Sequence, residues 1–491
     1  MALSPLSVHA GSYGGAVKSN LWGDASNPAG IRQQTGPNAS YAELYGGYTG
    51  GGFKSSSQAL DSWNAGAKAA TLVHYDRYSM KGSFSFEQFH GWGMAGSMFI
   101  TPSMYPVDVI EFTPGEKTRQ TYTFSGSFSA DLSDSWRLGA GMEFLSANYA
   151  KLKDVRHTNY RLDMTVTPGL LWHEGDFALG FNYIFHKESE TVDAEQVGTG
   201  QESYYAFLDK GILYGKYEIW NGSGTHLDEA GVNGFPVAQT AHGAAVQMSK
   251  GGFFTELKYL HTNGKVGEKQ QIWYRYGGDE LQARLLWRFS TSAVNHRISC
   301  LASWKSVTNN ETVLEKVNEG GITTVREHGA NEVYTRSFTT VEPRYEISAG
   351  TFSAEAVLTA RHTAEIATPM YPYIYLQDTY TLFLDITARK TFGHVTTALG
   401  MGFGDGYFTD SGKLSSETSG VTGEPYRLEG YWSGMMDYIV AKQLRLTPSL
   451  TYGFSNGLYL RLAGRFVKAF ELQVIKKTTR YDANLTLGYN F

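Results

Sequence analysis

The 491-residue sequence has a single cysteine, Cys300, few charged residues and no long apolar run. One cysteine cannot form an intramolecular disulfide, so a disulfide scaffold is excluded. Charged residues reach only 18% and aromatic residues reach 14%, a balance that excludes intrinsic disorder. No apolar run is long enough to cross a bilayer as a helix, which excludes a helical membrane protein. The formal net charge is −5, so no nucleic-acid partner is expected.

Glycine and aromatic residues are plentiful instead. The chain has 56 glycines in 491 residues, about 11% against roughly 7% in average usage. Together with the 14% of aromatic residues, this composition leaves two classes of protein. One is a large soluble β protein, and the other is a β-barrel of the outer-membrane kind.

Apolar and polar residues alternate with a period of two along much of the chain, which is the pattern of strands with two different faces. The last strand shows it best, with polar or glycine residues between its apolar ones. Those apolar residues are Tyr481, Ala483, Leu485, Leu487, Tyr489 and Phe491. The ranges 136–144, 177–185, 281–289 and 382–389 repeat the pattern.

A soluble β-sandwich would also alternate, but the lengths of the strands and connections favour a barrel. The strands run about ten residues, enough to span a bilayer when tilted, whereas globular strands average five to six. Short turns, for example at 133–135, 250–252 and 441–443, are expected to alternate with long connections. Those connections are expected near 91–117, 188–238, 309–332, 367–375 and 406–424. Short periplasmic turns and long extracellular loops are typical of outer-membrane barrels.

The sequence therefore predicts an all-β fold, a transmembrane antiparallel β-barrel of about 14–18 strands, and counting from residue 41 gives eighteen. Residues 1–40 are expected inside or below the barrel and residues 41–491 in its wall. The predicted location is the bacterial outer membrane. The first residues, Met1 to Pro5, have neither the basic nor the apolar part of a signal peptide, so the numbering is expected to be that of a mature chain.

Both ends of the chain resemble known outer-membrane barrels. The terminal Leu487-Gly488-Tyr489-Asn490-Phe491 resembles the assembly signal of such barrels, with Tyr489 and Phe491 in the matching positions. Asn27-Pro28-Ala29 resembles the Asn-Pro-Ala segment of the hatch inside FadL-type barrels and the PorV-like barrels of Bacteroidota. The whole chain is similar to Bacteroidota outer-membrane barrels. FadL-type barrels have fourteen strands, fewer than the count here, and Asn-Pro also favours an ordinary turn.

Charged residues of both signs occupy strand positions that would face the lumen, because an ionised side chain facing lipid at the midplane costs several kcal/mol. They form either a selectivity ring or a self-neutralising network, and their interleaved signs favour the network and a plugged or narrow barrel. The residues are Glu143, Arg161, Asp163, Arg284, Arg288, Glu346, Glu355, Arg361, Asp385, Arg389, Asp437 and Asp482.

The expected long loops are rich in aromatic residues, which solvated loops do not need. Three interpretations fit these residues: the loops pack together to cap the barrel, they bind a partner, or they bind a ligand. The candidates for partner or ligand binding are Tyr105, Tyr204, Tyr205, Tyr217, Trp220, Tyr371 and Tyr373.

No catalytic motif is recognisable: His-x-Ser, nucleophile elbows, His-Glu-x-x-His and Cys pairs are absent, so no enzyme, metal or cofactor is expected.

The first hypothesis is a FadL-like channel or uptake protein for a small solute, a hydrophobic one included. The second is a scaffold that does not transport and that holds surface lipoproteins or another barrel through its aromatic loops. Outer-membrane lipid and the barrel assembly machinery are expected partners in either case.

Overall fold

The structure is a computed structural model, and it describes residues 13–15, 17, 20–33, 36–153, 155–195, 204–220, 234–268, 271–320, 322–370, 373–411 and 428–491. All described strands belong to one sheet in which every pairing is antiparallel. Eighteen of them form a closed barrel, as the sequence predicted. The barrel closes where β1 pairs with β20, with Tyr41 opposite Asn490.

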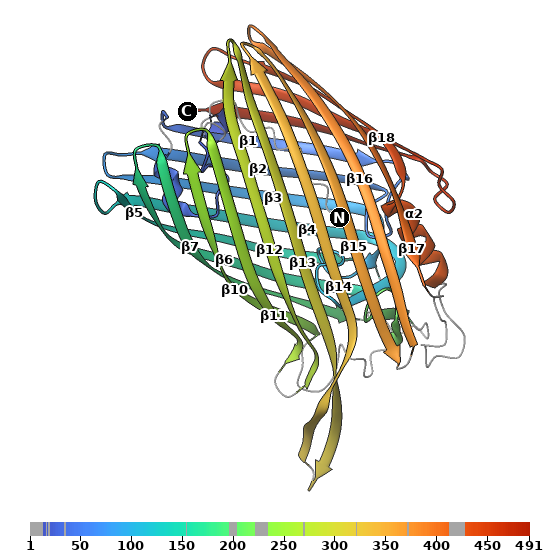
Figure 1. Cartoon of the computed structure of the whole chain (residues 1–491). Helices are drawn as coiled ribbons and strands as arrows, with labels where there is room; N and C mark the ends of the chain where they lie inside the picture. The colour runs from blue at the N-terminus through green and yellow to red at the C-terminus, as the bar shows by residue number, and fades with distance from the viewer. Residues whose placement is uncertain are drawn as a thin grey trace.

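The strands of the wall are long and strongly tilted (Figure 1). They are β1 (Ala39–Gly50), β2 (Asp61–His74), β3 (Tyr78–Ser97), β4 (Asp108–Asp131), β5 (Trp136–Lys151), β6 (Arg156–Glu174), β7 (Phe177–Glu195), β10 (Phe235–Lys250), β11 (Phe253–Glu268), β12 (Gln271–Thr291), β13 (Val294–Glu319), β14 (Ile322–Ala349), β15 (Phe352–Met370), β16 (Tyr373–Phe392), β17 (Val395–Asp410), β18 (Lys442–Gly453), β19 (Leu458–Phe470) and β20 (Thr479–Asn490).

The two ends of the barrel differ in their connections. At one end, called the short-turn end, two to four residues join each pair of strands. Gly175, Gly251, Gly350 and Gly393 have positive φ in four of these turns, a conformation that glycine adopts without strain. The prediction of a short turn at 441–443 at this end was wrong, because Ala441 follows α2 (Leu428–Ile439) and Lys442 and Gln443 begin β18 at the opposite, long-loop end.

Several segments predicted as long loops are largely strand. The wall strands run past the expected boundaries, so that 91–97, 108–117, 188–195 and 406–410 continue β3, β4, β7 and β17. The range 309–332 is mostly a two-stranded ribbon of β13 and β14, which reaches beyond all other strands (Figure 1). The sequence pattern did not reveal these strands, because both faces of the ribbon are exposed and polar. Apolar and polar residues therefore do not alternate along it. Residues 412–427 lie outside the described part of the chain.

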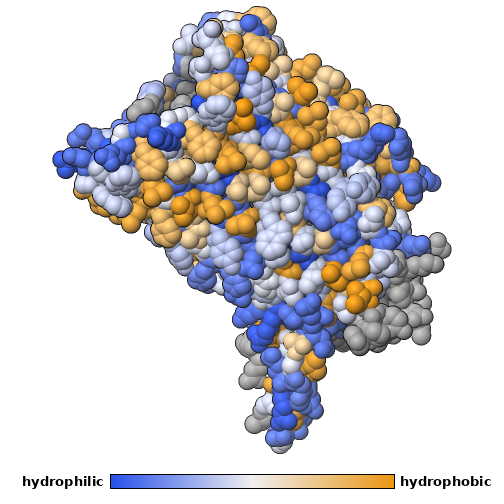
Figure 2. Space-filling view, in the orientation of Figure 1, coloured by the Kyte–Doolittle hydropathy of each residue, from blue (hydrophilic) through white to orange (hydrophobic). Residues whose placement is uncertain are grey.

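The outer face of the wall carries a band of exposed apolar residues (Figure 2). It arises because alternate residues of each strand point outward, for example Leu382, Leu384 and Ile386 on β16. Exposed aromatic side chains border the band at the short-turn end, including Trp136, Trp287, Phe352 and Phe392. None of the helices in the described residues is long and apolar enough to cross a membrane.

A cap lies at the long-loop end of the barrel. Within it, β8 (Tyr204–Asp209) pairs with β9 (Gly215–Trp220) and with the first residues of β4. Apolar side chains of β4, β8 and β9 pack against Leu428 at the start of α2. A second cluster joins the connection between β3 and β4 to β10, β11 and β12, through residues such as Phe99, Phe235 and Trp273. The cap is therefore a hydrophobic core between the ends of the wall strands.

Candidate functional site

An inner segment, residues 20–33, lies inside the barrel near the short-turn end. It ends in the 3₁₀ helix η1 (Pro28–Gln33), whose first four residues are buried. Asn27 caps this helix, since its Oδ1 accepts a hydrogen bond from Ala29 N at 3.0 Å. Asparagine before a helix and proline at its first position both favour helix initiation. The local sequence thus explains the turn into η1.

Asn27 connects the inner segment to three strands of the wall. Its Nδ2 lies within hydrogen-bond distance of Leu170 O at 2.9 Å, Phe181 O at 3.2 Å and Gln247 Oε1 at 3.1 Å. The residue is only 2% exposed. The structure therefore brings Asn27, Pro28 and Ala29 to the inner surface of the wall.

Glycines in the wall make room for the inner segment. A β-carbon at Gly139 would collide with the backbone of Ala29, and one at Gly169 would collide with the side chain of Asn27. At Gly180 a β-carbon would lie 2.8 Å from both Asn27 Nδ2 and Trp22. Gly139 on β5 and Gly169 on β6 are register partners, and Gly180 on β7 lies two residues from the partner of Gly169, so the wall has a hollow shaped to the segment.

Further contacts hold the inner segment on β4, β10, β11, β12 and β13. Trp22 donates from Nε1 to Ser249 Oγ at 2.9 Å and packs on Phe254. Ser26 Oγ donates to Glu256 Oε2 at 2.7 Å. Four further contacts involve charged side chains of the wall. They are Arg32 Nε with Asp131 Oδ1 at 2.8 Å, Arg288 with Asn20 O at 3.1 Å, Arg297 with Asp24 at 3.3 Å, and Arg284 with Asp24 O.

Ion pairs line the lumen along β14–β20 and the adjoining β1. Arg445 pairs with Asp385 at 3.0 Å, and Arg344 pairs with Glu342 at 3.0 Å and with Glu355 at 3.7 Å. Asp482 accepts from Arg465 and from Thr49 Oγ1, and Arg461 pairs with Glu43 at 2.9 Å. Several of these side chains remain accessible, and Asp24 of the inner segment is 60% exposed. Water therefore reaches this side of the lumen.

The structure places eleven of the twelve predicted lumen residues on wall strands, and Asp437 is the exception. Asp437 lies on α2 and accepts hydrogen bonds from the backbone amides of Gln473, Val474 and Ile475 at 2.9–3.0 Å. Its expected position on a wall strand was wrong, because the range 428–439 forms a helix. Sequence reasoning missed Glu342, Arg344 and Arg445, although Glu342 and Arg344 have the same strand parity as the predicted Glu346.

A buried ion cluster lies at the base of the cap. Glu111 pairs with Lys117 at 3.1 Å and with Lys151 at 2.6 Å, and all three side chains are fully buried. Lys117 also lies over the ring of Tyr149, 5.3 Å from its centroid. A single carboxylate thus compensates two buried ammonium groups, an arrangement in which losing the carboxylate is costly.

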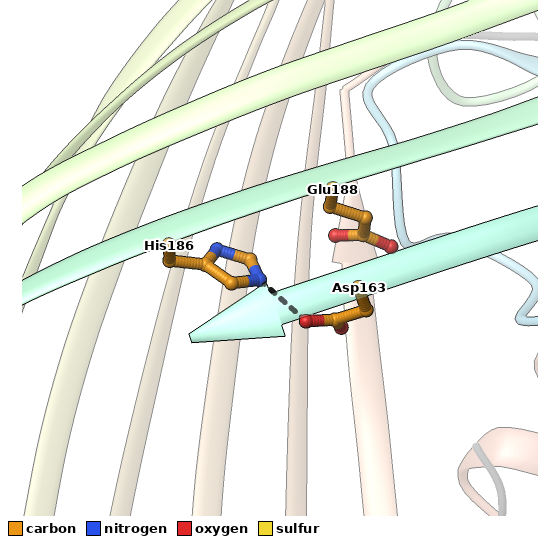
Figure 3. Close-up of side chains that lie close together, drawn as sticks. All are labelled: Asp163, His186 and Glu188. Atoms are coloured by element: carbon orange, nitrogen blue, oxygen red, sulfur yellow. Dashed lines mark hydrogen bonds and ion pairs between the residues drawn. The ribbon is translucent and has the colours of Figure 1, made fainter. Parts of the chain in front are cut away.

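Asp163, His186 and Glu188 bring three possible metal ligands together (Figure 3). His186 and Glu188 are two residues apart on β7, and Asp163 lies on the neighbouring β6, with His186 Nε2 2.9 Å from Asp163 Oδ1. Glu188 is already engaged by Arg161 at 2.9 Å, by Tyr105 Oη at 3.0 Å and by Gln239. The cluster is therefore part of a network of ion pairs and hydrogen bonds that joins the cap to the wall.

Two carboxyl groups face each other within the cap. Asp108 on β4 is directly opposite Asp209 on β8 in the strand register. Burial raises the pKa of Asp108 to about 7 and the pKa of Asp209 to about 8. Asp108 Oδ1 accepts from Ser97 Oγ at 2.7 Å, and Asp209 Oδ1 accepts from Gly211 N at 2.8 Å. Both groups therefore hold a proton more firmly than ordinary aspartic acids.

The described aromatic candidates of the loops are part of the cap. Tyr105 is 3% exposed and Tyr217 is 5% exposed, and Tyr205 packs against the cluster that includes Tyr217. Their placement agrees with the capping interpretation. Tyr371 lies outside the described residues, as do the side chains of Tyr204, Trp220 and Tyr373.

At the C-terminus, Tyr489 and Phe491 contact each other at 4.8 Å between ring centroids, and Phe491 is exposed.

The chain belongs to a family of unknown function, DUF6850, whose model matches residues 28–491. No curated protein matches the chain at a significant level.

Among solved structures, the chain is similar to the FrpB iron transporter from Neisseria meningitidis, with 9% identity, 94% of this chain and 82% of that chain covered, and a TM-score of 0.45. It is also similar to the outer membrane protein opdK from Pseudomonas aeruginosa, with 11% identity, coverage of 92% and 98%, and a TM-score of 0.32. For the P. putida toluene transporter TodX the identity is 9%, the coverage is 95% and 93%, and the TM-score is 0.30.

Proposed function

We propose that this member of the family is an outer-membrane channel that takes up a small solute, and that the inner segment is a hatch that moves to let the solute pass. The short-turn end would face the periplasm and the long-loop end the exterior, as in outer-membrane barrels. The observation that carries the proposal is that the two sides of the lumen differ. The hatch covers the wall from β4 to β13, whereas β14–β20 offers accessible ion pairs such as Arg445–Asp385.

The contacts of the hatch suit a part that moves. Most of them are hydrogen bonds, and water can replace these at a net loss of only about 0.5–1.5 kcal/mol each. Trp22 is the main apolar anchor, packed in a cluster with Leu171, Phe254 and Leu286. The segment is also short, so its displacement would leave the wall strands paired.

The lining of the lumen favours a polar solute. The side chains on β14–β20 that face inward are mostly charged or hydroxyl-bearing, and Asp385 is 42% exposed. Charged groups arranged in this way select solutes by charge and hydrogen bonding. The hydrophobic solute that the sequence analysis also allowed would lose hydration here without gaining apolar contacts.

A reversible lock on the hatch tests the proposal. Ser26 Oγ lies 3.2 Å from Asn182 Oδ1, so Ser26→Cys with Asn182→Cys, in a Cys300→Ser background, is the pair chosen to tie the hatch to β7 by a disulfide, whose formation is checked first by mass spectrometry. The purified protein in liposomes is assayed by swelling with small sugars and with amino acids of both charges. We expect flux in the reduced protein, its loss on oxidation and its return on reduction. Equal flux in both states, or none in either, would contradict the proposal.

The scaffold alternative is supported by the ribbon of β13 and β14. Beyond Glu311 on β13 and before Tyr334 on β14, the two strands pair only with each other. Exposed strand edges of this kind are a template for another chain. Replacing residues 314–327 with a two-residue turn should then abolish co-purification of a stoichiometric partner from native membranes while leaving the barrel folded.

A further inference from the structure

The outer face of β7, β10, β11 and β12 changes character in steps toward the long-loop end. On β7 the outward residues are apolar up to Phe185, and the next outward residue is the exposed Lys187. On β11 they pass from Leu257 through Tyr259 and His261 to the exposed Lys265. The order apolar, aromatic, cationic is the one expected where a wall leaves the hydrocarbon core and enters the layer of lipid headgroups.

Two of the cations at this level oppose each other directly. Lys265 on β11 and Arg275 on β12 are partners in the strand register. Like charges in directly opposite positions destabilise an antiparallel pair. Among the described residues, Arg275 pairs with Glu327 at 3.1 Å, and both side chains are about half exposed, so this pair adds little stability. The arrangement therefore leaves an excess of positive charge.

A row of hydrogen-bonded side chains lies just below these cations. Asp279 Oδ1 is 2.9 Å from His261 Nδ1 and accepts from Tyr259 Oη at 2.6 Å. Tyr183 Oη is 2.6 Å from His242 Nδ1. The carboxylate of Asp279 is thus bound by His261 and Tyr259. It does not neutralise Lys265 or Arg275, and the acidic partner of Arg275 among the described residues is Glu327.

The opposite side of the barrel differs at the corresponding boundary. There the outward residues of β15, β16 and β17 are His362, Asp378, Tyr380, Asp405 and Tyr407. His362 Nε2 lies 2.8 Å from Asp378 Oδ1, and its ring stacks on Tyr380. The boundary on these three strands carries carboxylates, and the neighbouring amine, Lys442 at the start of β18, pairs with Glu471 at 3.0 Å and lies near Asp405. The cations on this side are therefore compensated, unlike those on β7, β11 and β12.

We infer that the basic outer face, defined by Lys187, Lys265 and Arg275, binds the phosphate groups of an anionic lipid in the leaflet at the long-loop end. Phosphate oxygens form strong, charge-assisted hydrogen bonds with lysine and arginine. In a membrane the headgroup phosphates lie at the level where these cations follow the aromatic residues. The inference rests on the membrane location in the proposed function but not on transport through the lumen.

The test compares two lipids and two sets of variants of the full chain in detergent. The probes are a glycolipid with phosphate monoesters on its headgroup and the same glycolipid after enzymatic dephosphorylation, with binding measured by native mass spectrometry and by thermal shift. We expect the phosphorylated lipid to bind at least about tenfold more tightly. The triple variant K187Q/K265Q/R275Q should lose this preference, and the matched variant D378N/D405N on the other side should keep it.

Three outcomes would overturn the inference. They are equal binding of both lipids, unchanged preference in the triple variant, and competition by millimolar inorganic phosphate as strong as that by the lipid, which would assign the cations to a soluble phosphate. If the triple variant does not fold, K265Q alone should weaken binding and reduce its dependence on salt. Flux through the lumen should not change in any of these variants, so failure here is distinguishable from failure of the channel proposal.

Discussion

Asn27 lies so close to Gly169 that a β-carbon at position 169 would overlap the carboxamide of Asn27. The hatch and the wall therefore fit only because this strand residue has no side chain. We predict that Gly169→Val displaces the inner segment while the strand still pairs, because valine is favourable in strands. Faster liposome swelling than that of the native protein is the expected result.

Gly126→Val is the matched control for this change. Gly126 also lies in a wall strand, β4, and a β-carbon there would meet nothing within 4 Å. Swelling rates should stay at the native value in this variant. If both variants increase flux equally, valine acts on the wall in general and the contact with Asn27 is not responsible.

Removing the Asn27 carboxamide should loosen the hatch without disturbing the wall. Asn27→Ala removes the hydrogen bonds to Leu170 O, Phe181 O and Gln247 Oε1. An unsatisfied buried acceptor costs about 1–3 kcal/mol, so amide hydrogen exchange across residues 20–33 should accelerate at least tenfold. Asn148→Ala removes a hydrogen bond to Gln120 from an exposed position, and it should leave exchange in the hatch unchanged.

The buried cluster in the cap predicts a large effect from a small change. Glu111→Gln leaves Lys117 and Lys151 buried without a carboxylate. Breaking a buried ion pair by removing one partner costs about 3–5 kcal/mol. We expect faster proteolysis of the cap at constant pH. A second substitution, Lys151→Met, removes one of the two buried charges that have lost their carboxylate, and it should restore part of the cap's resistance to proteolysis. Failure to restore it would contradict the electrostatic explanation.

The stability of the cap should fall as the pH rises. Because burial raises the pKa of Asp108 to about 7 and that of Asp209 to about 8, the folded cap binds more protons than the unfolded chain, in which aspartic acid has a pKa of about 3.9. The stabilisation is complete below about pH 4 and declines through the window up to about pH 8. The measurement is hydrogen exchange of the β8 amides, corrected for the exchange rate of an unfolded peptide at each pH. Protection should drop by up to about tenfold per pH unit for each proton that the folded cap binds and the unfolded chain does not.

Asp209→Asn removes one of these titrations and should make the protection of β8 less dependent on pH. Asp134 lies in a turn at the opposite end of the barrel, so Asp134→Asn serves as the control. A native pH profile in the Asp209 variant would show that another group governs the cap.

The sequence predicted the wall well because each strand residue must face either lipid or the lumen. The alternation at 382–389 and 481–491 follows directly from that requirement, and it was enough for the count of eighteen strands. Prediction failed where this requirement ends. Glu188 and the ribbon of β13 and β14 fell into expected loops. Asp437 was placed on a strand, whereas it lies on α2, a helix that packs against the cap and that does not alternate with a period of two.

The alternation with a period of two, few charges and a terminal aromatic residue were thus sufficient for the closed barrel, since these properties belong to each strand separately. The interior depended on the tertiary structure. The hollow under Asn27 requires Gly139, Gly169 and Gly180 to be neighbours on three strands. Lys117 and Lys151 share Glu111 only because two strands place them side by side. Register between strands is set by the hydrophobic patterns of both strands and by the turn that joins them, so the residues of one strand alone do not decide which partner they will face.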